Sequence, residues 1–476
     1  MLDYLITNAK IADGAGIKEN ISVLGIKNGS IAYLGAQNDV PPQTKQTLDV
    51  CGALLTPGVI DVHAHSDSNI SCAENLLAQG VTTCLSGNCG LSPQIDFTLC
   101  RSKFEEQGYP INQAEQIGHS SLRLAVGVNN FYAAANSAQI KAMQELTRKA
   151  FDYGAAGLSF GLEYDPGSTK DEVITLAKTA VSCCKNHFPP LVTIHARNVD
   201  KSNDASILEA VNIAEETGAR LIISHLVYMW NGDGLKRTID IIAAARKRGL
   251  DVWADSGMWT AYSTTCGSAV FDEQEFIRKG YDFNKVLAAT GKYAGKFLNL
   301  EQYREIRNNS PKDCFIYDPG SASDIWTAFS LEDVMVSTDA APNKEGQGHP
   351  QNIATFPYFF RVMAKGGALN TNAAKNTEAD SSAAFAPYQF SICEALRRTS
   401  LLPAKALNLT QKGLIKIGMD ADIAVFNWNE LCEKASFPGI GDPNKPNIGV
   451  MHVFVNGVLS WTNQKRIKGV MAGKWL

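Results

Sequence analysis

Two histidines, His63 and His65, stand one residue apart at the end of an apolar run that begins at Leu54. Alternate side chains of a β-strand point to the same face, so both imidazoles should project together from the end of one strand. Two imidazoles on a rigid element provide half of a metal site. The alternative is that the pair only faces solvent or makes a hydrogen bond in the core, and the His-x-His pattern alone does not decide.

Four more side chains that can bind metals follow other apolar runs, and they are Cys89, His195, His225 and Asp339. Taken singly, each has another interpretation. Cys89 is also a typical small buried residue, Asp339 could begin a helix as its N-cap, and the two histidines could lie in the core. However, the chain has only eight histidines, and four of them, including the first pair, stand at the ends of predicted strands. This common position favours metal binding.

The elements that must position these side chains are strands that alternate with amphipathic helices between residues 56 and 404. This alternation predicts a parallel α/β fold. The clearest predicted strands are residues 59–65, 82–90, 157–164, 191–197, 221–227, 251–256 and 334–339. An eighth strand is ambiguous, because residues 121–126 are the more apolar candidate and residues 110–118 the alternative. Eight such units would close a (β/α)8 TIM barrel, whose chemistry lies at the carboxyl ends of its strands.

The two ends of the chain have a different pattern. Residues 1–55 and 405–476 contain short predicted strands with turn signals such as Asn28-Gly29, whose residues tolerate positive φ. We expect both ends to form one composite β-sandwich beside the barrel of residues 56–404. Residues 266–325 are too long for an ordinary connection and predict a helical insertion over the barrel mouth.

The composition restricts the class of protein. A net charge of −4 without a basic block argues against nucleic acid or a membrane surface as partner. No apolar run approaches the ~20 residues that span a bilayer, and the first residues do not form a signal peptide. Eleven cysteines, an odd number, suit free thiols in a reducing compartment. We expect a soluble cytoplasmic protein that acts on a small molecule, and a homo-oligomer is left open.

Several motifs together resemble the amidohydrolase superfamily, and within it the N-acyl-D-amino acid deacylases, or D-aminoacylases. The motifs are His63-x-His65, the segments 86–92 and 157–164, His195, Ser224-His225 and Ser337-Thr338-Asp339. The Gly-Asn-Cys-Gly segment at 87–90 is the most specific, because most binuclear relatives place a carboxylated lysine between the metals and this branch uses a cysteine. The resemblance covers nearly the whole chain, and it places the end of the ambiguous strand near His119.

The resemblance implies two metal positions. The tighter one would use Cys89, His195 and His225, and a second, weaker one would use His63, His65, Cys89 and Asp339. Zinc suits a set of thiolate, imidazole and carboxylate ligands, and a bound metal lowers the pKa of water toward neutrality. The resemblance further implies that Asp339 takes the proton of the attacking water and then gives it to the leaving amine.

The substrate-binding positions depart from the family pattern. The resemblance assigns substrate contacts to the positions of Tyr164, Ser263, His119 and Gln351. The family has a lysine where this chain has Val227 and an arginine where it has Gln351, and a neutral amide cannot replace the paired hydrogen bonds of a guanidinium. We therefore expect a substrate with less negative charge. Arg197 could supply a cation instead, or it could simply pair with a nearby carboxylate.

Two alternatives to a linear-amide hydrolase follow from the same resemblance. One is a cyclic-amide hydrolase of the hydantoinase or dihydroorotase kind. Against it, residues 161–164 offer no lysine that could become carboxylated. The other is a barrel that has lost its chemistry and serves as a scaffold. Such proteins lose metal ligands, whereas every ligand position is filled in this chain.

Overall fold

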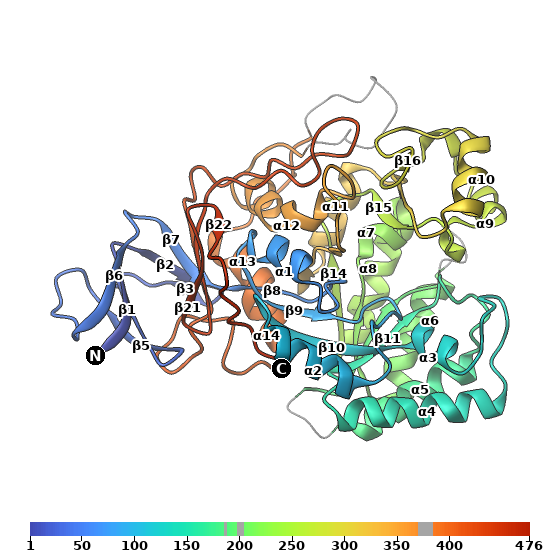
Figure 1. Cartoon of the computed structure of the whole chain (residues 1–476), viewed down its shortest axis with the longest axis horizontal. Coiled ribbons are helices and arrows are strands. Elements are labelled where there is room, and N and C mark those ends of the chain that lie inside the picture. The colour runs from blue at the N-terminus through green and yellow to red at the C-terminus, as the bar shows by residue number, and fades with distance from the viewer. Residues whose placement is uncertain (185–187, 198–203, 370–383) are drawn as a thin grey trace.

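The computed structural model describes residues 1–184, 188–197, 204–369 and 384–476. Its central feature is a sheet of eight strands in the order β18-β14-β13-β12-β11-β10-β9-β8, with all neighbouring pairs parallel (Figure 1). In chain order these strands are β8 (Val59–Asp61), β9 (Val81–Ser86), β10 (Asn112–Gly118), β11 (Gly157–Gly161), β12 (Leu191–His195), β13 (Arg220–Ile223), β14 (Val252–Ser256) and β18 (Val334–Val336).

The first and last strands of this sheet meet just beyond their carboxyl ends. The backbone N–H of Asp339 donates to the carbonyl of His63 at 2.9 Å, and the N–H of His65 donates to the carbonyl of Ala340 at 2.6 Å. These two bonds bring three predicted metal ligands, His63, His65 and Asp339, together at the seam, the place where the ends of β8 and β18 meet. The predicted (β/α)8 barrel is confirmed.

The ambiguous strand is β10, so the strand end near His119 that the resemblance implies is confirmed, and the more apolar candidate at residues 121–126 is not a strand. That segment lies in helix α3 (His119–Ala125), and the alternative at residues 110–118 is correct. A search for apolar runs does not find this strand, because most of its side chains are polar although they are buried. Gln116 donates through Nε2 to the Asn88 side chain at 3.0 Å, and Asn112 donates through Nδ2 to the carbonyl of Thr82 at 3.0 Å. These polar groups are therefore paired inside the barrel.

Helices surround the barrel on its outer side (Figure 1). After the first five strands come α1 (Ile70–Leu77), α2 (Phe97–Gln107), α3, α4 (Ser137–Asp152), α5 (Lys170–Cys183) and α6 (Ala205–Thr217). After them follow α7 (Leu226–Met229), α8 (Gly232–Lys247), α11 (Ala322–Ser330), α12 (Gln351–Phe359) with the π-helix η3 (Phe360–Ala364), α13 (Ile392–Leu396), the π-helix η5 (Arg397–Leu401) and α14 (Leu402–Ala406).

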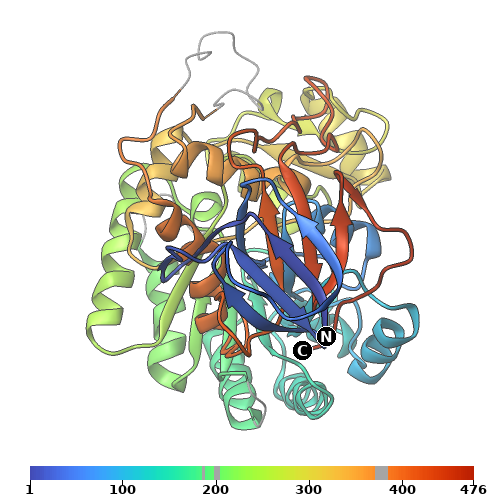
Figure 2. The same ribbon diagram turned by 90° about the vertical axis from the view of Figure 1, so that its left-hand side faces the viewer.

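Both ends of the chain contribute to the sheets beside the barrel. One sheet has the order β5-β4-β1-β6, from β1 (Leu2–Thr7), β4 (Val23–Lys27), β5 (Ser30–Gly35) and β6 (Thr44–Asp49). The other has the order β22-β21-β20-β19-β7-β2-β3, from β2 (Lys10–Asp13), β3 (Gly16–Ile17), β7 (Leu54–Pro57), β19 (Ile423–Phe426), β20 (Val450–Val455), β21 (Val458–Thr462) and β22 (Lys465–Arg466). Figure 2 shows these N-terminal blue strands and C-terminal red strands together in front of the barrel.

The pairing of β7 with β19 joins the two chain ends in one sheet. Apolar side chains from both ends share a core, among them Ile6, Ile26, Ile423 and Phe454. The β4–β5 hairpin turns at Asn28 and Gly29 with φ of 51° and 81°, as the turn signal predicts. The exact domain boundaries at 55 and 404 stay predictions.

The long segment after β14 folds as a small unit at the barrel mouth, drawn in yellow-green to yellow in Figure 1. It contains β15 (Tyr262–Thr265), η1 (Ala269–Phe271), α9 (Glu273–Arg278), η2 (Phe283–Lys285), β16 (Leu287–Ala288), α10 (Leu300–Asn309) and β17 (Cys314–Tyr317). The strands form a sheet in the order β15-β17-β16, so the segment mixes helix and strand where only helix is expected from the sequence. Aromatic residues such as Phe276 and Tyr303 form its own apolar cluster.

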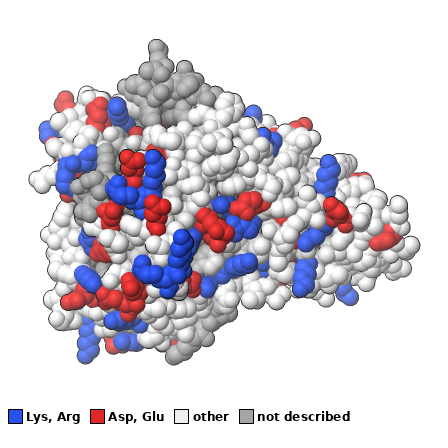
Figure 3. Space-filling view, turned by 180° about the vertical axis from the view of Figure 1, so that it is seen from behind, with Lys and Arg blue, Asp and Glu red and all other residues white. Residues whose placement is uncertain are grey.

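The surface carries both signs of charge. Figure 3 shows basic and acidic side chains interspersed over the face drawn there. Within the described ranges, no helix combines the length and the apolar character that crossing a bilayer requires. No disulfide joins any of the cysteines within the described residues.

Candidate metal centre

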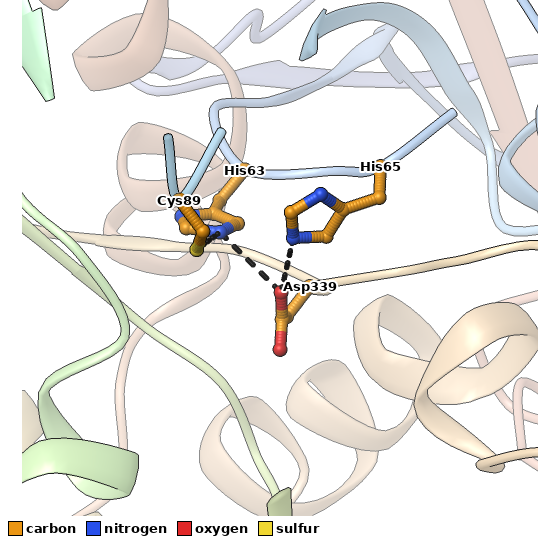
Figure 4. Close-up of side chains that lie close together, drawn as sticks. All are labelled: His63, His65, Cys89 and Asp339. Atoms are coloured by element: carbon orange, nitrogen blue, oxygen red, sulfur yellow. Dashed lines mark hydrogen bonds and ion pairs between the residues drawn. The ribbon is translucent and has the colours of Figure 1, made fainter. Parts of the chain in front are cut away.

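Four predicted ligands lie together at the seam between β8 and β18 (Figure 4). Asp339 Oδ1 lies 3.3 Å from His63 Nε2 and 3.2 Å from His65 Nε2, so both imidazoles point at one carboxylate oxygen. Cys89 Sγ lies 3.3 Å from His63 Nε2. One thiol, two imidazoles and one carboxylate thus converge from three strand ends.

A second group shares the cysteine and consists of Cys89, His195 and His225. Cys89 Sγ lies 3.5 Å from His225 Nε2, and the ring centroids of the two histidines are 4.7 Å apart. In each group the candidate ligand atoms lie within 4.8 Å of one another. The structure therefore brings together all six side chains that the sequence singles out, with Cys89 between the two groups.

The backbone at three of these residues is in the left-handed region, with φ of 53° at Cys89, 35° at His225 and 52° at Asp339. Such conformations are costly for residues other than glycine and cluster at functional sites. Close packing fixes the cysteine loop, because a Cβ atom at Gly161 would lie 2.1 Å from the carbonyl oxygen of Cys89. The glycine is thus required for the position of the thiol.

Carboxylates outside the predicted set support the histidine rings. Glu163 Oε2 lies 2.9 Å from His195 Nε2, and Asp255 Oδ2 lies 3.8 Å from His63 Nδ1. Asp255 also accepts the backbone N–H of His225 at 2.9 Å. Sequence reasoning missed both carboxylates as parts of the site, although each stands at or just beyond the end of a barrel strand, which was the available signal.

Acidic groups, the Cys89 thiol and the Asp339 carboxyl, lie next to histidines in this site, and each changes the pKa of its neighbours. Burial alone would raise the pKa of Cys89, yet the neighbouring His63 charge and the adjacent imidazoles of His195 and His225 hold that pKa well below its usual value. Burial likewise opposes ionisation of Asp339, but hydrogen bonds from His63 and His65 keep its pKa well below normal. For His195, burial lowers the pKa, whereas Cys89 and Glu163 raise it to about 9. The anionic thiolate and carboxylate attract positive charge strongly here.

The donor set fits a divalent metal of the zinc type. Thiolate, imidazole and carboxylate are the ligands that zinc prefers. Nδ1 of His195 is buried and has no hydrogen-bond partner, and Nε2 of His225 faces the Cys89 thiol at 3.5 Å. A metal and protons compete for the same thiol and imidazole groups. The negative charge of the thiolate and the carboxylate therefore favours a bound metal cation as it favours protons.

The two groups open into a cavity of about 390 Å³ at the barrel mouth. Tyr164, Ser263 and Gln351 line it, as the sequence predicts for substrate contacts. His119 does not. It is fully buried, with Nε2 2.9 Å from Glu172 Oε1, and its assignment to substrate binding stays a prediction.

Gln351 already uses its amide for other contacts. Its Oε1 accepts the hydroxyl of Tyr228 at 2.7 Å, and its Nε2 donates to the Asp339 carbonyl at 2.7 Å. Nε2 also lies 3.5 Å from Asp339 Oδ2. The side chain therefore holds Asp339 in place, and only 2% of Gln351 is exposed to a substrate.

Arg197 does not supply the missing cation. It forms an ion pair with Glu209 at 3.0 Å and donates to the carbonyls of Pro166 and Ser168. Among the described residues that line the cavity there is no lysine or arginine, whereas Asp67 and Glu163 are present beside Asp339. The remaining lining includes apolar groups such as Leu91 and Met229.

Comparison with known proteins agrees with this geometry. The Amidohydrolase family model matches residues 323–471. The N-acyl-D-glutamate deacylase of Alcaligenes xylosoxydans xylosoxydans is 26% identical, with 96% of this chain and 93% of the relative covered. The D-aminoacylase of the same organism is also 26% identical, with 100% and 97% covered.

Solved structures show the same fold. A crystal structure of D-aminoacylase superposes with a TM-score of 0.82 at 23% identity and covers 100% of this chain and 99% of its own. The N-acyl-D-glutamate deacylase from Bordetella bronchiseptica, solved with zinc and a phosphonate inhibitor, gives a TM-score of 0.80 at 23% identity, with 100% and 99% covered.

The barrel and its strand-end side chains agree with these matches, in which the Amidohydrolase family model covers the C-terminal part of the chain. Over its whole length the chain is similar to the N-acyl-D-amino acid deacylases, so the resemblance stated from the motifs is confirmed.

Proposed function

We propose that the protein is a zinc-dependent hydrolase of linear amides that removes the acyl group from N-acyl-D-amino acids with uncharged side chains. The observation that supports this most is the pair of candidate ligand groups that share Cys89 and open into the barrel cavity. The D configuration and the linear amide come from the names of the full-length relatives.

Different residues of the site would bind the metal and transfer the proton. Cys89, His195 and His225 would hold the tighter metal, and the group that ends in Asp339 a second, weaker one. A bound divalent metal polarises the scissile carbonyl and acidifies water. Asp339 lies at the cavity, and its side chain is only 12% exposed. Its low pKa keeps it ionised at neutral pH, so it can accept the proton of the attacking water and pass it to the leaving amine.

The proposed preference for uncharged side chains follows from the cavity. The relatives named for D-glutamate and D-aspartate act on acidic amino acids. In this chain the described lining has no cation, and the Gln351 amide is engaged with Tyr228 and Asp339. A second carboxylate on the substrate would find no partner to replace its hydration, which is costly.

A cyclic-amide hydrolase is less well supported. The end of β11 is followed by Leu162, Glu163 and Tyr164, so this strand provides no lysine that could bridge two metals. The scaffold alternative requires lost ligands, and all six are in place.

The test is amine release by the zinc-loaded protein from matched pairs of N-acetyl-D- and N-acetyl-L-amino acids. Leucine, methionine, glutamate and lysine would represent apolar, acidic and basic side chains. We expect the D-leucine and D-methionine compounds to be cleaved fastest. Best cleavage of the D-glutamate compound would contradict the proposed pocket chemistry. No release from any compound with metal bound would contradict the linear-amide function, and cyclic amides would be tested next.

A further inference from the structure

A buried ion pair links the insertion to the metal centre. Lys279 follows α9 in the insertion, and its Nζ lies 2.5 Å from Oε1 of Glu163, just beyond the end of β11. The side chains are only 3% and 10% exposed. Removing two charges from water is costly unless they are well paired, so this pair needs a reason to be retained. Neither residue has a part in the hydrolysis proposed above.

The second carboxylate oxygen of Glu163 gives that reason. Oε2 lies 2.9 Å from Nε2 of His195, a ligand in the group that includes Cys89 and His225. An ionised carboxylate only accepts hydrogen bonds, so Nε2 of His195 must carry the proton. The ring atom left for a metal is then Nδ1, which is buried and has no hydrogen-bond partner. A carboxylate that receives the second N–H of a metal-binding histidine fixes its tautomer and ring orientation.

Lys279 is better explained by this role than by substrate binding. Its ammonium group is neutralised by Glu163, and it is not among the described residues that line the cavity. Its position on the insertion also matters, because the barrel supplies Glu163 and His195 whereas the insertion supplies the cation that holds Glu163 in place.

We propose that Glu163 and Lys279 are positioning residues for the metal position formed by Cys89, His195 and His225, and that they couple this position to the insertion. The proposal rests on the proposed function only in requiring a metal at these ligands, and it does not depend on which amide is cleaved. Since coupling between two sites is reciprocal, metal binding should restrict the insertion as much as the insertion supports the metal.

The first test measures zinc affinity by competition with a chelator, using the full-length protein after metal removal. Three variants are needed, namely Glu163→Gln, Lys279→Met and the double variant Glu163→Leu/Lys279→Met, which leaves no unpaired buried charge. Lys285→Met is the matched control, because Lys285 is an exposed lysine of the same insertion. Circular dichroism confirms that each variant is folded.

We expect the double variant to bind zinc about 10–100-fold more weakly, as is typical when the partner of a metal-binding histidine is removed. Glu163→Gln should lose less, because the amide oxygen can still accept from Nε2, and Lys285→Met should bind as the natural protein does. Unchanged affinity in a folded double variant would overturn the proposal. If the natural protein binds no zinc, the proposed function fails as well, so the two failures are distinguishable.

The second test follows the coupling itself by hydrogen–deuterium exchange of residues 273–285 with and without zinc. Zinc should lower exchange in this segment in the natural protein and in Lys285→Met, and it should have a much smaller effect in Lys279→Met. The same zinc-dependent decrease in Lys279→Met and in the natural protein would overturn the coupling. A purely structural role of Lys279 would change exchange equally with and without zinc.

Discussion

Asp339 combines two tasks at the residue scale. Its Oδ1 lies within 3.3 Å of both His63 and His65, and its backbone N–H donates to the carbonyl of His63 where the first and last barrel strands meet. Gln351 contacts both its carbonyl and its carboxylate. Such a firmly held carboxylate loses little orientational freedom when it transfers a proton.

Replacing Asp339 by asparagine removes the proton acceptor but not the ligands of the tighter metal position. We expect Asp339→Asn to lower the rate of amine release by about 10²–10⁴-fold, the usual contribution of a general acid–base group. Zinc bound at Cys89, His195 and His225 should remain. The measurements are turnover and metal content on the same sample, with the exposed Asp240→Asn as control. Turnover close to that of the control would rule out Asp339 as the base.

Sequence reasoning singled out the six side chains that lie together in the candidate metal centre, because their types and strand-end positions are local properties. It did not reach Glu163 or Asp255 as partners of His195 and His63, because a carboxylate that faces an imidazole is set by neighbouring strands and not by spacing along the chain. It also did not anticipate that Asp339 and Glu172 use the polar groups of Gln351 and His119 inside the protein.

At the scale of elements, the carboxyl ends of the strands are packed so closely that some positions accept only glycine. A Cβ atom at Gly161, the last residue of β11, would meet the Cys89 carbonyl oxygen at 2.1 Å and its carbonyl carbon at 2.7 Å. The cysteine loop of β9 and the end of β11 therefore approach each other through backbone atoms, and this approach sets the position of the thiol.

Gly161→Ala should push the Cys89 loop outward. We expect it to lower the free energy of unfolding by about 1–3 kcal/mol, the usual cost of overpacking, and to weaken zinc binding because the thiol moves. Gly418→Ala is the control, since a Cβ atom there meets nothing within 4 Å although its φ of 92° carries strain of its own. Denaturant unfolding and chelator competition measure the two effects. Equal zinc affinity in both variants would contradict the link between this packing and the metal site.

The elements also show where pattern reading succeeds. Apolar strands such as β12 and β18 are evident from the sequence, as is the β4–β5 turn. The strand β10 is not, because Asn112 and Gln116 are buried with partners from other strands. An isolated polar segment cannot reveal such partners.

At the scale of the whole molecule, candidate metal ligands from five barrel strands and lining residues from the segment after β14 surround one cavity. The segment after β14 adds Tyr262, Ser263 and Val270 to the cavity lining, and its Lys279 pairs with Glu163 beside the candidate metal centre. Its length is visible in the sequence, but its three-stranded sheet and its contact with Glu163 depend on packing against the barrel. Sequence reasoning therefore predicts the structure of the barrel better than that of the segment at the barrel mouth.

The most direct test of the account is a zinc titration of the metal-free protein, with amine release from N-acetyl-D-leucine recorded at each addition. We predict no release without metal, a rise as the Cys89, His195 and His225 position fills, and neither tight binding nor release in Cys89→Ala. Full release by the metal-free protein, or by Cys89→Ala, would contradict the claim that this cysteine-centred metal site is the hydrolytic centre.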